Sequence, residues 1–184
     1  RKHQHGRPRP WRLATMLVLA AVLAGGLGWV LGRHQAQPAP ALAHLVAPAA
    51  FAHRVYATDP RHPVEFDASR AAQLAAWVSE RMHSALSPPD LTAAGFRLVG
   101  GRLLPSTNRM AAQFLYEDNA GRRVSLYVRR ADWQAASDAF HYRELDGLGV
   151  FYWTRGEMAH ALAGRLPRAK LIELAARVQA ADAG

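Results

Sequence analysis

The stretch "AAQFLYEDNAGRRVSLYVRR" (Ala111 to Arg130) decides the fold class of the C-terminal part of this chain. Two strand-forming runs flank "NAG", whose residues favour a tight turn, so the stretch predicts an antiparallel hairpin. In the second run, apolar side chains alternate with polar or amphipathic ones, which predicts a strand with one buried face. The alternating positions are Val124, Leu126 and Val128 against Ser125, Tyr127 and Arg129.

Further strands are predicted on both sides of this hairpin. "FHYRELD", "GVFYWTR" and "MAHALAGRL" follow it and predict three strands that bend at "DGLG" and "RGE". Upstream, "HRVYA" (His53–Ala57) and "HPVEF" (His62–Phe66) predict two short strands around the turn residues "TDPR". "GFRLVGGRLLP" predicts another hairpin, with its turn at Gly100-Gly101, because glycine adopts the positive φ angles of a two-residue turn.

Two helices complete the predicted domain. Asp67 suits the cap of a helix that runs to about His83, and Pro167 suits the first turn of a last helix. Each helix has one apolar face at helical spacing, so both are expected to cover one face of a meandering antiparallel sheet, in an α+β domain. These faces consist of Ala71, Leu74, Ala75, Val78 and Met82, and of Leu171, Leu174, Ala175 and Val178.

The stretch "RPRPWRLATMLVLAAVLAGGLGWVLGRH" predicts a transmembrane helix. Twenty consecutive residues, Leu13 to Gly32, carry no charge, and at about 1.5 Å per residue they span roughly 30 Å, the thickness of the bilayer's hydrocarbon core. Trp11 and Trp29 lie near its two ends, where indole rings favour the headgroup region. A cleaved signal peptide is the alternative, but its apolar region is usually shorter. Because the chain begins at Arg1 and not at methionine, we expect further residues upstream.

Charge predicts the orientation of this helix and the organisation of the chain. Five basic residues precede the span and only Arg33 follows it closely, which places the N-terminus in the cytoplasm. The chain then divides into a basic cytoplasmic flank (1–12), the transmembrane helix (13–32), an Ala/Pro-rich juxtamembrane linker (33–50) and an extracytoplasmic domain (51–184). Arginine outnumbers lysine 21 to 2 and alanine is abundant, a composition typical of GC-rich bacterial genomes. We therefore expect a single-pass protein of a bacterial inner membrane, with this last domain in the periplasm.

The net charge of +9 does not indicate a nucleic-acid-binding protein. From Phe51 onward there are 17 basic and 14 acidic residues, so the domain itself is only about +3. The basic flank is instead expected to attract anionic lipid. No motif of a nucleophile, a phosphate-binding loop or a zinc protease is present, and the sequence has no cysteine. We expect neither an enzyme nor a bound cofactor, and a metal site formed around a cross-strand pair of His53 and His62 is the less favoured alternative.

Three sets of residues are candidates for contacts with partners. Small residues at a spacing of four in the predicted span would allow two helices to pack closely, which leaves a homodimer open. The polar, proline-punctuated linker is expected to be accessible to envelope proteases. In "VFYWT" (Val150 to Thr154), the aromatic side chains belong either to the core or to a patch for a partner. These sets are Ala24, Gly28 and Gly32; Gln35, Ala36, Gln37, Ala41 and Ala43; and Phe151, Tyr152 and Trp153.

The order of these segments resembles the proteobacterial transmembrane anti-sigma factors. The phrases "HPVEF", "GFRLVGGRLLP" and "LYEDNAGRRVSLYV" carry the resemblance most specifically, and it extends over nearly all of residues 8–180. It implies an upstream cytoplasmic domain that holds an extracytoplasmic-function sigma factor. That domain often has a zinc-binding His-x3-Cys-x2-Cys motif, which this chain lacks.

The resemblance implies a regulator that senses an envelope signal and releases its sigma factor through regulated proteolysis. A membrane-tethered periplasmic binding or scaffold module without a regulatory role is the alternative.

Overall fold

The computed structural model describes residue 42 and residues 44–59, 61–106, 109–131 and 138–181. Within these residues, no helix combines the length and the apolar character needed to cross a bilayer. The predicted span, Leu13–Gly32, lies outside the described residues, as does the predicted flank. Both stay predictions.

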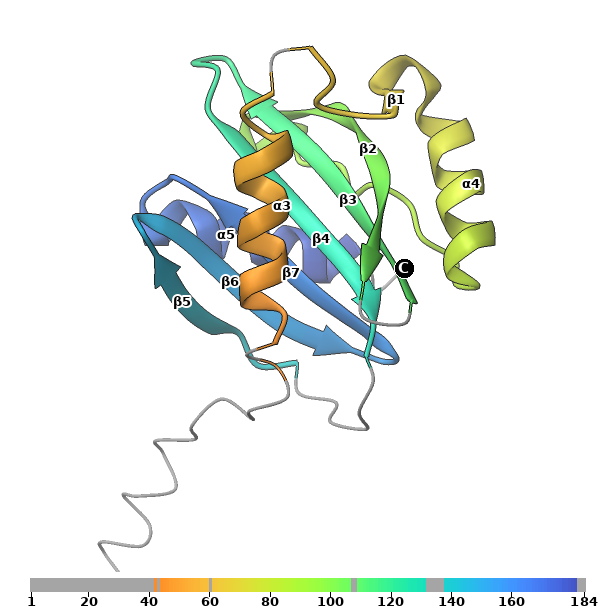
Figure 1. Ribbon diagram of the computed structural model, residues 1–184. Helices are drawn as coiled ribbons and strands as arrows, with labels where there is room; N and C mark the ends of the chain where they lie inside the picture. Colours follow the sequence, from red (N-terminus) through yellow and green to blue (C-terminus); the bar gives the residue numbers. More distant parts are fainter. Residues whose placement is uncertain (1–41, 43, 60, 107–108, 132–137, 182–184) are drawn as a thin grey trace, which may run out of the picture. The chain divides into compact units, whose positions relative to one another are not determined.

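The domain is built on one seven-stranded antiparallel sheet (Figure 1). Its strands lie in the order β1-β2-β3-β4-β7-β6-β5. They are β1 (Phe66–Asp67), β2 (Phe96–Ser106), β3 (Arg109–Asp118), β4 (Arg123–Arg130), β5 (His141–Leu145), β6 (Leu148–Arg155) and β7 (Met158–Gly164). The α+β class is confirmed, but the strand order is not a simple meander. The second half of the sheet is reversed, so that the last strand pairs with β4.

Helices cover both faces of the sheet, where the sequence predicted cover on only one. Helices α4 (Ala71–Met82) and α5 (Arg168–Ala181) pack on one face, as predicted, and bury Leu74, Val78, Leu171 and Leu174 there. Helix α3 (Val46–Tyr56) packs on the other face and forms a second apolar cluster with it. Figure 1 shows α3 in front of the sheet and α5 behind it.

Helix α3 corrects two predictions. Residues 44–50 were assigned to the linker and "HRVYA" to a strand, yet residues 46–56 form one helix with a buried face. Pro48 lies in the first helical turn, where backbone N–H groups have no partner within the helix, so the ring does not interrupt its hydrogen bonds. The folded domain therefore begins before residue 51, and Leu42 and Leu45 are already buried.

The Gly100-Gly101 pair is not a hairpin turn. Strand β2 continues through both glycines, which pair with Phe66 and Asp67 of β1 and shift the register against β3. A Cβ atom at Gly100 would lie 2.0 Å from the backbone oxygen of Phe66, so glycine allows β1 to approach closely. Because β1 contains only two residues, most of "HPVEF" is not a strand.

The remaining local predictions are confirmed, with one correction. Asp67 accepts a hydrogen bond from the backbone N–H of Ser69 and caps a short 3-10 helix, η1 (Ala68–Arg70), that leads into α4. A second 3-10 helix, η2 (Thr92–Ala94), precedes β2. The hairpin of β3 and β4, the three last strands and α5 are present as predicted. Strand β4, however, is buried on both faces and not on one, because α3 covers its second side.

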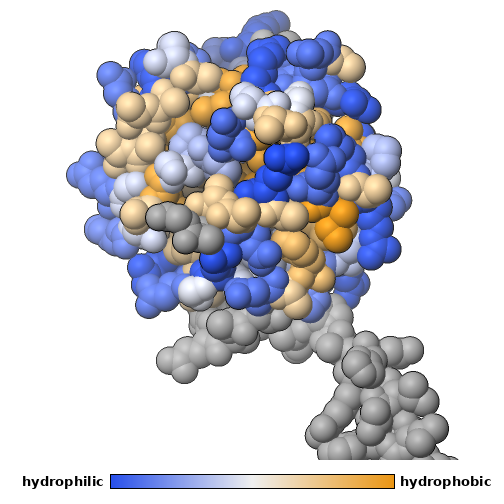
Figure 2. All heavy atoms as spheres, turned by 180° about the vertical axis from the view of Figure 1, so that it is seen from behind, coloured by the Kyte–Doolittle hydropathy of each residue, from blue (hydrophilic) through white to orange (hydrophobic). Residues whose placement is uncertain are grey.

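The face opposite α3 presents a mixed surface. Figure 2 shows hydrophobic residues there divided by hydrophilic ones into small areas. Over the whole surface of the described residues, the exposed large apolar side chains are Met110 on β3, Ile172 on α5, and Phe51 and Val55 on α3 itself.

Candidate functional site

The interface between α3 and the sheet is the candidate functional site. Helix α3 is the first described helix of the domain and begins within the predicted linker, so whatever holds it in place also holds that part of the linker against the sheet. The sheet beneath it has small side chains, which let a helix approach closely. They include Ala111, Ala159, Ala161 and Ala163, and the helix contributes Ala49, Ala50 and Ala52.

A buried hydrogen bond joins the middle of this interface. Nδ1 of His53 and Oγ of Ser125 on β4 are 2.8 Å apart, and both side chains are almost completely buried. Burial lowers the pKa of His53 to about 4, and the guanidinium groups of Arg165 and Arg54 act in the same direction. The imidazole is therefore neutral at ordinary pH, and its protonation would place a charge inside the interface.

Two arginines fasten the C-terminal end of α3. Arg54 forms an ion pair with Asp146 in the turn between β5 and β6, at 2.8 Å. Arg123 of β4 donates from Nη1 to the backbone oxygen of Ala57 at 2.8 Å, and this oxygen belongs to the C-cap of the helix. An arginine suits this position because the C-terminal end of a helix carries partial negative charge.

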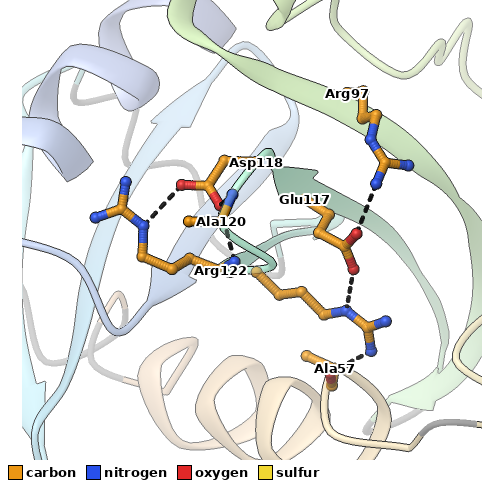
Figure 3. Close-up of polar contacts among 7 residues, drawn as sticks. Ala57, Arg97, Glu117, Asp118, Ala120 and Arg122 are labelled. Carbon is orange, nitrogen blue, oxygen red and sulfur yellow. Dashed lines mark hydrogen bonds and ion pairs between the residues drawn. The ribbon is translucent and has the colours of Figure 1, made fainter.

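Arg123 belongs to a larger polar group at the β3–β4 turn (Figure 3). Glu117 of β3 accepts from Arg123 at 2.8 Å and from Arg97 of β2 at 2.7 Å, so one carboxylate links three strands and the end of α3. The Glu117 side chain is only 17% exposed, which makes this pairing less screened than one at the surface. A displacement of α3 would therefore disturb the hydrogen bonds of Arg123 at the β3–β4 turn.

Asp118 holds the same turn in shape. Its carboxylate accepts from the backbone N–H groups of Ala120 and Arg122 and from the Arg122 side chain at 2.7 Å (Figure 3). Burial opposes the charge on this carboxyl, but the hydrogen bonds outweigh it and lower the pKa of Asp118. The turn next to α3 is thus held by three hydrogen bonds to one carboxylate, and each of its two carboxylates is paired with an arginine.

The structure assigns the aromatic run to the core. Phe151, Tyr152 and Trp153 are at most 2% exposed, so they form no surface patch for a partner. The other predicted site residues lie outside the described residues: the helix-packing positions Ala24, Gly28 and Gly32, and the linker positions Gln35, Ala36, Gln37, Ala41 and Ala43. Dimerisation and cleavage at those positions stay predictions.

His53 and His62 are not a cross-strand pair. His53 is buried on α3, whereas His62 lies exposed in the segment before β1. The described residues contain no group of three or more histidines and acidic residues that could hold a metal ion.

Sequence reasoning missed the residues that fasten α3. Arg54, Arg123, Ser125 and Asp146 come from three distant parts of the chain, and no local pattern connects them. One signal was present, because Leu42, Leu45, Val46, Ala49, Ala50 and His53 recur at helical spacing across the predicted linker.

Comparisons with known proteins give little support to any assignment. The chain matches no protein-family model and no curated protein. Among solved structures it is similar to a crystal structure of MucB in complex with MucA(peri), with a TM-score of 0.37 and 18% sequence identity. The match covers 44% of this chain and 31% of that chain, so it spans less than a third of the solved protein. A match of this size establishes no shared fold over the whole domain.

Proposed function

We propose that the chain is the membrane anchor and periplasmic sensor domain of an anti-sigma factor in a bacterial inner membrane. The proposal combines the family resemblance of the sequence with one structural observation: α3, a helix that begins within the predicted linker, is buried against the sheet. In this role the chain is not an enzyme. Its state decides whether an upstream cytoplasmic domain keeps an extracytoplasmic-function sigma factor or releases it.

The docked helix supplies a physical route for the signal. Proteases cut extended, unprotected chain, and residues of a packed helix are protected. While α3 is docked, a protease on the periplasmic side has only the predicted linker before Leu42. Undocking of α3 would add residues 42–57 to the accessible chain. A first cut there, followed by cleavage within the predicted span, would free the cytoplasmic domain and its sigma factor.

The test is a reporter gene of the cognate sigma factor in cells that carry the complete protein. Ala161 lies at 0% exposure in the cluster beneath α3, so Ala161→Arg should displace the helix. We expect constitutive reporter activity and a shortened protein in this variant. Ile172→Arg is the matched control, because Ile172 is exposed on α5, on the other side of the sheet.

A fold defect must be separated from undocking of α3. Hydrogen exchange of the Ala161→Arg protein should show faster exchange in residues 46–56, with α4 and α5 still protected. If only α3 is exposed and the reporter stays silent, the proposed route is wrong. Replacing residues 33–41 by a rigid, protease-resistant segment should abolish induction, and unchanged induction would count equally against it.

The upstream gene sequence tests the assignment directly. A preceding helical domain whose product co-purifies with a sigma factor is the expected result. Absence of a bound sigma factor would favour the alternative, a tethered binding module. One observation favours that alternative: a hollow of about 550 Å³, within the range of small-molecule sites, lies beside the β6–β7 turn. Arg155 and His160 line it together with the apolar side chains of Leu86 and Met158.

A further inference from the structure

His53 is the ionisable side chain that α3 buries against the sheet. It is 6% exposed, whereas Arg54 is exposed and Tyr56 only half-buried. The ring meets Ser125 of β4, which is 1% exposed, through the hydrogen bond of 2.8 Å between Nδ1 and Oγ. A group that can change its charge therefore lies on the contact surface of the helix whose release the proposed function requires.

Two cations lie near this ring. Arg54 follows His53 on α3, Arg165 lies in the segment between β7 and α5, and both oppose a positive charge on the ring. The β5–β6 turn holds both of them. Asp146 pairs with Arg54 through its carboxylate, and its backbone oxygen accepts from Nη1 of Arg165 at 3.0 Å. The carboxylate of Asp146 is thus already engaged, and a proton on His53 would meet two anchored guanidinium groups.

The sheet presents little negative charge to α3. Side chains alternate along each strand, so the strand pairings show which residues share the face of Ser125. From β3 to β7, Glu117 is the acidic residue on this face, and Arg97 and Arg123 already share its carboxylate. Strand β7 presents alanines there. The other titratable side chains of these strands on this face are Arg109 of β3, Arg123, Tyr127 and Arg129 of β4, His141 and Arg143 of β5, and Tyr152 of β6.

Protonation of His53 would oppose the docking of α3 through its charge. The serine hydroxyl can donate or accept, so its hydrogen bond survives with Nδ1–H as the donor. The imidazolium, however, would be enclosed between α3 and side chains such as Ala161 and Ala163, which offer no acceptor for its second N–H. When α3 leaves the sheet, the ring reaches water, which stabilises the charge. Acid therefore favours the released helix.

Helix α3 can leave the sheet while the rest of the domain stays folded. Its apolar cluster is separate from the cluster that holds α4 and α5 on the other face. The Arg54–Asp146 pair adds little, because both side chains are exposed to solvent. Three of the four apolar side chains that the helix buries are alanines, which remove less apolar area from water than larger residues do. The four are Val46, Ala49, Ala50 and Ala52.

We propose that protonation of His53 releases α3, so that the domain senses acidification of the compartment in which it lies. Small ions pass the water-filled porins of an outer membrane, so the pH of a periplasm follows that of the medium. The release itself is a property of the folded domain. Its effect on transcription rests on the proposed function, in which release of α3 admits the first cut.

The size of the effect follows from the two states of the ring. The pKa of His53 is about 4 in the docked state, and an exposed histidine has a pKa of about 6.5. The released state therefore binds a proton at a higher pH, so docking is fully favoured above about pH 6.5 and becomes less favoured as the pH falls towards 4. The released population should rise about 20-fold between pH 7 and pH 5.

The test is amide hydrogen exchange of the 184-residue chain in detergent micelles, corrected for the intrinsic effect of pH on exchange. Between pH 7 and pH 5, protection of residues 46–56 should fall about 20-fold, while α4 and α5 keep theirs. His53→Asn should remove this fall. His141→Asn is the matched control, because His141 lies on the same face of the sheet but stacks on Tyr152 of β6. This control should leave the fall unchanged.

Ser125→Ala separates the charge from the hydrogen bond. It removes the partner of His53 but keeps the titrating ring. Helix α3 should therefore open more readily at every pH, while the dependence on pH remains. A dependence that is lost in Ser125→Ala and retained in His53→Asn would overturn the inference.

Two further outcomes decide between the switch and its cellular role. Equal protection of residues 46–56 at pH 7 and pH 5, or equal losses in α3, α4 and α5, would overturn the inference. In cells, acid medium should activate the sigma-factor reporter with the wild type and not with His53→Asn. A reporter that Ala161→Arg activates and acid does not would exclude acid as the signal. A reporter that stays silent in both cases, although acid releases α3 in the purified chain, would overturn the proposed function and leave the switch intact.

Discussion

Protonation of His53 is expected to destabilise the domain in mild acid. Its pKa lies near 4 in the folded protein, against about 6.5 for an exposed histidine. The unfolded chain therefore binds a proton at a higher pH than the folded one, so stability is complete above about pH 6.5 and falls as the pH drops towards 4. The full difference corresponds to about 3 kcal/mol, and about 2 kcal/mol of it is lost between pH 7 and pH 4.5.

Urea unfolding of the 184-residue chain in detergent, followed by tryptophan fluorescence, measures this loss. His53→Asn keeps a polar group near Ser125 but has no titrating ring, so its stability should change much less over the same interval. His83→Asn is the matched control, because His83 is exposed and lies at a positive φ angle that asparagine tolerates.

Carboxyl groups such as Asp118 have a lowered pKa, and the stability that they contribute is lost mainly at lower pH. Above about pH 4.5, the difference in stability between the wild type and His53→Asn therefore reports on His53. Equal slopes of stability against pH for the wild type and His53→Asn would refute the reasoning. Hydrogen exchange should also show that α3 is the first element to open in acid.

Two further substitutions and one control variant test the framework around α3. Gly100→Ala places a Cβ against the backbone of Phe66 and should lower the free energy of unfolding by about 2–3 kcal/mol in a thermal or urea titration. Gly121 has a positive φ but open space around it, so the control Gly121→Ala should lower the free energy of unfolding by only about 1 kcal/mol. Glu117→Gln removes the carboxylate that pairs with Arg123 and should cost about 1 kcal/mol at low salt and less at high salt, whereas a salt-independent loss would point to packing.

The sequence by itself determined the elements whose signal is local. The β3–β4 hairpin, the last three strands and the buried face of α5 follow from a period of two or of 3.6 residues and from turn residues at the bends. The cap at Asp67 is local for the same reason, since donor and acceptor are two residues apart.

Only the tertiary structure decided what covers the second face of the sheet. Residues 44–56 pack on strands more than fifty residues away in sequence, so their helix depends on a surface that no local window contains. The same holds for Gly100, whose role depends on the approach of β1, and for the contact of His53 with Ser125, which are 72 residues apart. Periodicity shows which side chains will be buried. It does not show which distant segment will bury them, because that choice depends on shape and charge that arise only when the sheet has formed.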